Sequence, residues 1–170
     1  DAKIEAREDL SVIAATGELV EELRTVAVSA APDPRNAQIG WRGIAPEGGP
    51  ATDLSLYHLA RIKAGAPEMG RDYGPGEVFS TDVTHDRLSG INYKKGCFVG
   101  QEVVSRTHRR GKIRKRTYVL HAENITPAQE VTAGNAVGEV TSASATHALA
   151  RLRTDRLARA LEDGETLSAA

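Results

Sequence analysis

Alternating apolar and polar positions at the start of the chain predict short strands. In residues 1–7, Ala2, Ile4 and Ala6 alternate with Lys3, Glu5 and Arg7, which is typical of a half-buried strand. Residues 11–15 predict a second strand, 18–23 a short helix, 26–28 an extended piece and 39–44 a further strand. The prolines of residues 30–36 and the turn-forming cluster 46–50 predict loops between these elements.

The clearest helical pattern lies just after this region. Leu56, Leu59 and Ile62 form an apolar stripe, Thr52 or Asp53 caps the start, and Gly65 followed by Pro67 ends the helix. Residues 70–76 predict a loop. A second helix is predicted over 99–110, because Glu102 and Arg106 then pair at i,i+4 and Gly111 follows the last turn.

Short strand-like runs replace the helical pattern beyond Lys112. Residues 116–121, 136–141 and 148–153 predict strands, with a hairpin connection at Gly134-Asn135. Residues 154–161 suit a short helix that Thr154 caps and that Gly164 follows. We therefore predict an α+β fold with two domains, residues 1–110 and a small β-rich domain over 111–170.

The composition is that of an ordinary globular protein. Of the 170 residues, 40% are hydrophobic and 26% charged, and with 4% aromatics the core must be mainly aliphatic. No apolar run is long enough for a bilayer, and no basic-then-apolar leader is present, so we expect neither a membrane partner nor export. The single cysteine indicates a reducing compartment, and the start at Asp1 indicates processing or a fragment.

Positive charge is concentrated in residues 94–116, around that cysteine. This segment holds nine of the 22 Lys and Arg residues but one of the 23 Asp and Glu residues, Glu102. The remainder of the chain is therefore acidic, which weakens general adhesion to nucleic acid. The local basic patch can still hold one anionic ligand.

Cys97 has the surroundings of a reactive residue. Lys94 and Lys95 precede it, and the amides at the start of the predicted helix face it. Both features favour the thiolate, which is the form that acts as nucleophile and metal ligand. Gly96 and Gly100 permit a tight turn and the close approach of a ligand.

Two other interpretations of Cys97 are open. One is a small buried apolar side chain in a loop that the glycines merely shape. The other is a metal ligand with His85 and His108 as companions. One cysteine and scattered histidines lack the spacing of a zinc site, so we expect no metal site in this chain.

The densest run of charge is residues 109–116. It is interpreted either as a solvated helix end and edge strand, or as an anion site for a polyglutamate tail, RNA or an acidic partner. RNA-binding surfaces usually place aromatic residues among the basic ones, and only Tyr118 is near. Direct binding of nucleic acid is therefore not expected.

The segment around Cys97 carries a specific resemblance. Lys-Gly-Cys-Phe-Val-Gly-Gln-Glu at 95–102, followed by Val-Val-Ser-Arg, resembles the signature of the folate-binding YgfZ family. That family is related to the aminomethyltransferase (T-protein) of the glycine cleavage system. Agreement extends to Asp33-Pro34-Arg35, Gly40-Trp41-Arg42, 61–67 and 137–142, so the resemblance covers roughly residues 33–156.

The resemblance implies a T-protein/YgfZ-like fold: an incomplete ferredoxin-like α/β domain followed by a small C-terminal β-barrel-like domain. It implies three lobes around a central hole for tetrahydrofolate, and a role with iron–sulfur proteins or their assembly machinery. Carried over residue by residue, Cys97 and Lys95 are the expected reactive residues. The expected folate-binding residues are Arg61, Gly96, Gly100, Gln101, Glu102 and Arg106.

Two departures from the family refine this expectation. The family's first segment of about a hundred residues is absent, so the folate pocket is expected to be incomplete. Lys63 stands where the T-protein branch has a carboxylate. We predict a folate-dependent accessory protein that acts through Cys97 in assembly or repair of iron–sulfur enzymes, including tRNA-modifying ones.

A T-protein-like, tetrahydrofolate-dependent aminomethyltransferase is the alternative, so enzymatic activity itself is left open. An RNA-binding module that uses residues 109–116 ranks third. The expected location is the cytoplasm, with the mitochondrial matrix as the alternative.

Overall fold

The computed structural model describes residues 3–48, 53–97, 99–111 and 113–169. The chain divides into two compact units, Asp1–Ala60 and Arg61–Ala170. This division lies at residue 60, whereas the sequence predicted a domain boundary after residue 110. No helix within the described ranges has the length and apolar character that crossing a membrane requires.

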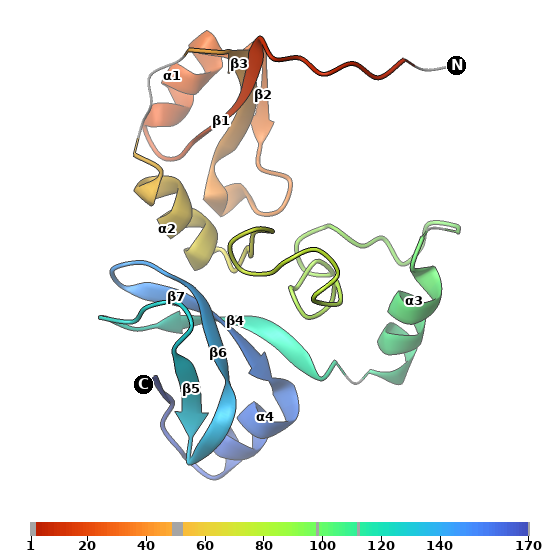
Figure 1. Ribbon diagram of the computed structural model, residues 1–170, viewed down its shortest axis with the longest axis vertical. Helices are drawn as coiled ribbons and strands as arrows, with labels where there is room; N and C mark the ends of the chain where they lie inside the picture. The colour runs from red at the N-terminus through yellow and green to blue at the C-terminus, as the bar shows by residue number, and fades with distance from the viewer. Residues whose placement is uncertain (1–2, 49–52, 98, 112, 170) are drawn as a thin grey trace. The chain divides into compact units, whose positions relative to one another are not determined.

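The first unit is a three-stranded antiparallel sheet with one helix against it (Figure 1). Its elements are β1 (Leu10–Ala15), α1 (Leu19–Val26), β2 (Ser29–Pro32), the 3₁₀ turn η1 (Ala37–Ile39) and β3 (Trp41–Pro46), in the sheet order β1-β3-β2. Leu23 of α1 is buried against β3, where a Cβ atom at Gly43 would lie 3.3 Å from the Leu23 side chain and 3.0 Å from Ala27 Cβ. The small residue thus lets the helix pack closely on the sheet.

Four sequence predictions for this unit are corrected. Residues 3–7 form no strand, and Ile4 is 95% exposed, because alternation alone provides neither a partner strand nor a face to cover; residues 1 and 2 lie outside the described ranges. The segment 26–28 was predicted to be extended, but Val26 is the last residue of α1. The segment 30–36 was predicted to be a loop, but its first residues belong to β2. This strand is at the sheet edge, where a proline is tolerated. The predicted strand 39–44 starts later, at Trp41.

Helix α2 (Ser55–Lys63) confirms the strongest helical prediction but buries a different face. Asp53 Oδ1 accepts a hydrogen bond from the Ser55 amide at 2.8 Å, so Asp53 supports the helix start; Thr52 lies outside the described residues. The buried positions include Arg61 and Ile62, whereas Leu56 is 54% exposed. The predicted apolar stripe is therefore wrong at Leu56.

The second unit is built on a five-stranded antiparallel sheet with the order β4-β7-β6-β5-β8. Its elements are α3 (Gln101–Arg110), β4 (Lys115–His121), β5 (Glu130–Ala133), β6 (Asn135–Ala143), β7 (His147–Arg153), α4 (Thr154–Glu162) and β8 (Ser168–Ala169). The core contains Val131, Val137, Val140, Leu152 and Leu157. It is aliphatic, as the composition predicts.

The C-terminal predictions are largely confirmed. The three predicted strands fall within β4, β6 and β7, Gly134 turns with φ +61° between β5 and β6, and α4 occupies the predicted helix. Thr154 is not the cap, because Arg153 holds that position and the Thr154 hydroxyl donates to the Ile113 carbonyl. Among the described strands β4 and β8 are outermost, and they form no closed barrel. The mixed α+β character is confirmed, and the ferredoxin-like arrangement stays a prediction.

Candidate functional site

Cys97 lies at the surface, in the loop before α3. Its side chain is exposed, so the interpretation as a buried apolar residue is wrong. Asn92 shapes the loop, because its Oδ1 atom accepts hydrogen bonds from the Lys94 amide at 2.9 Å and the Lys95 amide at 3.2 Å. Lys95 and Gly96 are exposed beside the sulfur. Phe98, the next residue of the motif, lies outside the described residues.

A ring contact joins the start of this loop to α3. The rings of Tyr93 and His108 stack with centroids 3.9 Å apart and planes at 19°. Helix α3 itself begins at Gln101, after Gly100 adopts φ +82°, a conformation that favours glycine. The loop that carries Cys97 is therefore held at both ends, by the Tyr93 stack and by the helix start.

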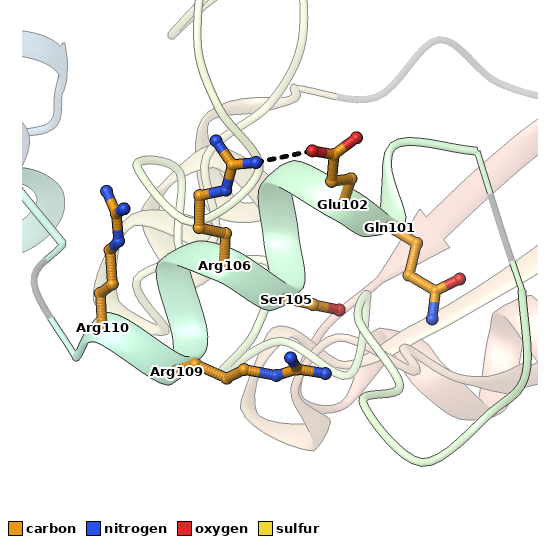
Figure 2. A pocket seen from close by; sticks show the side chains of 6 residues that line it. All are labelled: Gln101, Glu102, Ser105, Arg106, Arg109 and Arg110. Atoms are coloured by element: carbon orange, nitrogen blue, oxygen red, sulfur yellow. Dashed lines mark hydrogen bonds and ion pairs between the residues drawn. The ribbon is translucent and has the colours of Figure 1, made fainter.

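One side of α3 forms a hollow of about 520 Å³ (Figure 2). Its lining is Gln101, Glu102, Ser105, Arg106, Arg109 and Arg110, so three of the predicted folate-binding residues gather here. Arg106 Nη2 lies 2.6 Å from Glu102 Oε1, which confirms the predicted i,i+4 pair. No residue of α3 is buried, so the side chains of this helix are accessible to a ligand or partner.

The basic run 109–116 is not uniformly available to an anion. Arg116 is buried and forms a two-pronged ion pair with Asp86, at 3.0 and 2.9 Å. Arg109, Arg110 and Arg114 are exposed, while Lys112 lies outside the described residues. The predicted anion site is therefore reduced by one cation that serves the fold.

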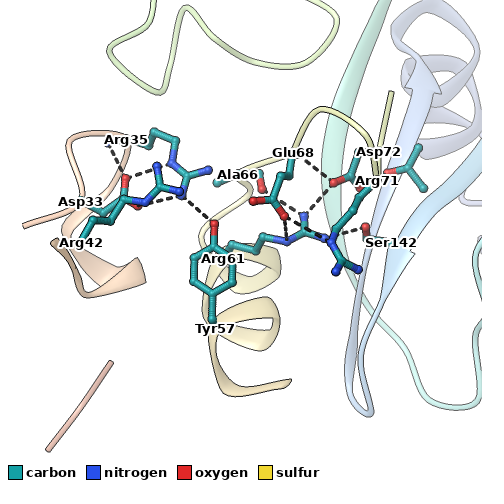
Figure 3. A network of polar contacts seen from close by, with 11 residues as sticks. Asp33, Arg35, Arg42, Tyr57, Arg61, Ala66, Glu68, Arg71, Asp72 and Ser142 are labelled. Carbon is teal, nitrogen blue, oxygen red and sulfur yellow. Dashed lines mark hydrogen bonds and ion pairs between the residues drawn. The ribbon is translucent and has the colours of Figure 1, made fainter. Parts of the chain in front are cut away.

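Arg61 stands in a buried network, only 2% exposed (Figure 3). Its Nη1 lies 2.7 Å from Asp72 Oδ2, its Nη2 donates to Ser142 Oγ at 2.9 Å, and its Nε lies 3.5 Å from Glu68. These partners are far apart in sequence, so they tie α2, the following loop and β6 together. A role of Arg61 toward a ligand stays a prediction.

A β-bulge lets two consecutive residues reach this network. Register shifts between Val140 and Ser142, so Thr141 is the extra residue of β6. Neighbouring side chains of a regular strand point to opposite faces. Here, in contrast, Ser142 accepts from Arg61, and the Thr141 hydroxyl donates to Asp72 Oδ1 at 2.7 Å.

The motif residues of the first unit also form an ion-pair network (Figure 3). The buried Asp33 carboxylate accepts from Arg35 Nη2 at 2.7 Å and lies 3.7 Å from Arg42, and Arg35 donates to the Tyr57 hydroxyl at 3.1 Å. Burial acts to raise the pKa of Asp33, but the hydrogen bonds and charge of Arg35 outweigh it and hold the pKa below its usual value. These motif residues therefore support the fold.

The predicted site residues fall into separate groups. Cys97, Lys95, Gly96 and Gly100 share the loop, Gln101, Glu102 and Arg106 share the hollow on α3, and Arg61 belongs to its own buried network. Within the described ranges no group of three or more His, Cys, Asp or Glu side chains could hold a metal ion. His85 bonds to the Tyr73 hydroxyl, at 3.2 Å, and His108 stacks on Tyr93.

Sequence reasoning missed the residues that position these groups. The sequence placed Asp72 in a predicted loop and assigned no role to Asp86. It also gave no role to Asn92, whose side chain accepts hydrogen bonds from the amides of the following turn. Asn92 could have been found, since Asn commonly accepts from amides two or three residues ahead. Asp72 and Asp86 carry no such signal, because their partners lie 11 and 30 residues away.

The chain is similar to a family model and to several proteins of known function. Residues 114–170 match the family model described as "CAF17, C-terminal beta-barrel domain". The chain is similar to the mitochondrial iron–sulfur cluster assembly factor IBA57 of Mus musculus, with 38% identity over 109 residues, 60% of this chain and 30% of the relative. For IBA57 of Homo sapiens the values are 37% over 112 residues, 62% of this chain and 32% of the relative.

A fungal relative extends this similarity. The IBA57 homologue of Neurospora crassa is 34% identical over 120 residues, 64% of this chain and 27% of the relative. The chain thus spans about three tenths of the length of these curated relatives. The similarity is to iron–sulfur cluster assembly factors, the class that the resemblance to the YgfZ family implies.

Proposed function

We propose that this chain is part of an assembly factor for iron–sulfur proteins and that Cys97 is its reactive residue. The iron–sulfur cluster is the cargo, and the exposed sulfur engages the cluster, a sulfur donor or a partner protein. Similarity to the IBA57 assembly factors supports the class of function. We further propose that the assembly factor acts in the manner of the YgfZ family and that tRNA-modifying enzymes are among the proteins it serves.

The exposure of Cys97 is the observation that carries the proposal. A thiol that exchanges a ligand with another protein must be reachable by it, and only the accessible sulfur is a nucleophile or ligand for a partner. Cys97 meets this requirement, and Asn92 and the Tyr93–His108 stack hold the loop around it. Lys94 and Lys95 add positive charge that suits an anionic, thiolate-bound cluster.

Replacement of the sulfur alone tests this function. In cells that depend on the whole protein, Cys97→Ser should lower the activities of iron–sulfur enzymes and leave iron-free enzymes unchanged. Ser105→Ala, which alters a hydroxyl on neighbouring α3, is the matched control. Normal iron–sulfur enzyme activities with normal amounts of the Cys97→Ser protein contradict the role of Cys97.

Tetrahydrofolate is proposed as a ligand of the longer protein only. The described residues of this chain do not fit a folate site by themselves, because Arg61 is engaged by Asp72 and Ser142 while Gln101, Glu102 and Arg106 lie in a separate hollow. We expect titration of this chain with tetrahydrofolate to give weak or no binding. Tight binding would mean that this chain suffices.

The enzyme alternative has less support. An aminomethyltransferase of the T-protein kind needs a group that orients the folate, and Lys63, at the corresponding position, is exposed on the last turn of α2. The names of the relatives place those proteins in mitochondria, which supports the mitochondrial matrix over the cytoplasm as the location of the longer protein. Fractionation of cells that express the tagged protein tests this location.

A further inference from the structure

A second hollow, of about 770 Å³, lies within the unit 61–170. Three segments line it: residues 76–82, the C-terminal half of α3, and residues 113–115. It does not include Cys97, and none of its charged residues except Arg106 was assigned to the folate site. Arg106 and Arg110 line both hollows, but the second hollow contains no residue of the Cys97 loop, so its chemistry does not depend on the role of Cys97.

Four cations line this groove. Arg106 and Arg110 are one turn apart and leave α3 on the same side, whereas Arg109 points elsewhere (Figure 2). Arg114 and Lys115 follow in the chain and complete the basic lining. Within the described parts of the chain, Arg110 and Arg114 form no ion pair, and the only ion-pair partner of Arg106 is the exposed Glu102. The groove thus keeps positive charge that the fold does not neutralise.

Within the described residues, the two carboxylates of the groove form no ion pair with Arg110 or Arg114, and Glu77 is paired with Arg151 instead. Glu77 accepts hydrogen bonds from Arg151 at 3.0 Å and from the Gly74 amide at 2.6 Å. Burial raises the pKa of Asp82, although the Phe79 amide, at 3.4 Å, and the charges of Lys115, Arg151 and Arg116 act to lower it. Neither carboxylate cancels the charge of Arg110 and Arg114, so the groove is suited to an anion.

The lining is also partly apolar. Val78 and Ile113 contribute aliphatic surface, and Phe79 is 64% exposed. A sugar–phosphate backbone has no group that would bury such surface, and base stacking usually uses several aromatic residues. A protein segment that combines carboxylates with apolar side chains complements both properties of this groove.

We propose that this groove binds an acidic peptide segment of a partner protein, with apolar side chains against Phe79 and carboxylates against Arg110 and Arg114. The proposal stands on the chemistry of the groove and does not depend on the role of Cys97. It assigns the charge of Arg110 and Arg114, within the basic run 109–116, to an acidic partner, one of the three anionic ligands that the sequence leaves open for this run.

Fluorescence anisotropy with the whole 170-residue chain tests this assignment. The probe is a short labelled peptide of Glu and Leu residues, with a Glu–Ser peptide of equal charge and a single-stranded RNA of equal charge as competitors. The Glu–Leu peptide should bind, more weakly at high salt, and should compete better than either alternative. Charge reversal by Arg110→Glu with Arg114→Glu should weaken binding about tenfold or more, since exposed charge contacts are individually modest.

Arg109→Glu is the control for the Arg110 reversal, because it makes the same change of charge on the same helix at a residue outside the groove. It should weaken binding much less than the double reversal, and Phe79→Ala should remove the preference for Leu over Ser. Equal competition by the Glu–Ser peptide, tighter binding of RNA, or equal loss with Arg109→Glu overturns the proposal. Self-association that the double reversal abolishes would also overturn it, because a second copy would then be the occupant. If the double variant fails to fold, Phe79→Ala and the salt dependence of the unchanged chain decide.

Discussion

Several charged side chains of this protein are withdrawn from water and held by named partners. Arg61 meets Asp72, Arg116 meets Asp86, and Asp33 meets Arg35. A buried charge that loses its partner is costly, because the remaining group keeps its desolvation penalty. These residues therefore matter for stability even where the family resemblance points to a ligand.

Removal of Arg61 should destabilise the second unit strongly. In Arg61→Ala the Asp72 carboxylate stays buried without its cation, and we expect a loss of about 3 kcal/mol or more in the free energy of unfolding. Urea denaturation followed by circular dichroism measures it. Arg106→Ala, which breaks the exposed pair with Glu102, should cost less than about 1 kcal/mol. Equal losses for both variants would contradict a structural role of Arg61.

Asp33 should make stability depend on acidity. Its pKa is lowered in the folded state, so its contribution is present above the ordinary value and is lost as pH falls below about 4. Asp33→Asn should reduce stability at pH 7 and lose less on acidification. Fluorescence of Trp41, the single tryptophan, in the neighbouring strand reports this unit. An unchanged acid dependence in the variant would contradict the assignment.

The sequence identified these residues as important but did not identify the residues that they contact. The motif resemblance singled out Arg61 and Asp33-Pro34-Arg35, yet it could not indicate that Arg61 is paired with Asp72, 11 residues away, and Ser142, 81 residues away. Contacts over such separations depend on how the sheet and loops fold. A local pattern therefore identified the residue but not its role.

At the scale of elements, the close pairing of β6 with β7 depends on a glycine. A Cβ atom at Gly138 would lie 2.2 Å from the Arg151 carbonyl oxygen and 2.8 Å from the Leu152 Cα. Both are backbone atoms and cannot move aside cheaply. Position 138 therefore requires glycine because β7, the neighbouring strand, leaves no room for a side chain.

Gly138→Ala should accordingly separate these strands and cost about 2 kcal/mol or more, within the upper range for overpacking. Thermal unfolding followed by circular dichroism measures the change. Gly96→Ala is the control, because nothing lies within 4 Å of its added methyl group. A Gly138→Ala protein as stable as the control would contradict the pairing.

Elements with a strong period were predictable, and elements that need a distant partner were not. Helices α2, α3 and α4 and strands β4, β6 and β7 follow from spacing and turn residues. The two-residue β8 has no pattern of its own, and residues 3–7 alternate without forming a strand. In both cases the outcome depends on whether another strand pairs with the segment.

At the scale of the whole molecule, the features assigned to function are surface features on one unit. The loop of Cys97, the hollow on α3 and the groove with Arg110 all belong to residues 61–170. The sequence located this region through its motif and charge. It did not reveal that Arg116 is withdrawn into an ion pair, or that the predicted folate residues separate into three groups.

The central claim is that the Cys97 sulfur lies at the surface of a folded loop, within reach of a partner. The rate at which the folded chain reacts with 5,5′-dithiobis(2-nitrobenzoate), compared with the chain in denaturant, tests it directly. Because the side chain is exposed, the two rates should agree within about tenfold. Protection of the folded chain by about a thousandfold would mean that the sulfur is buried, and it would remove Cys97 from the proposed function.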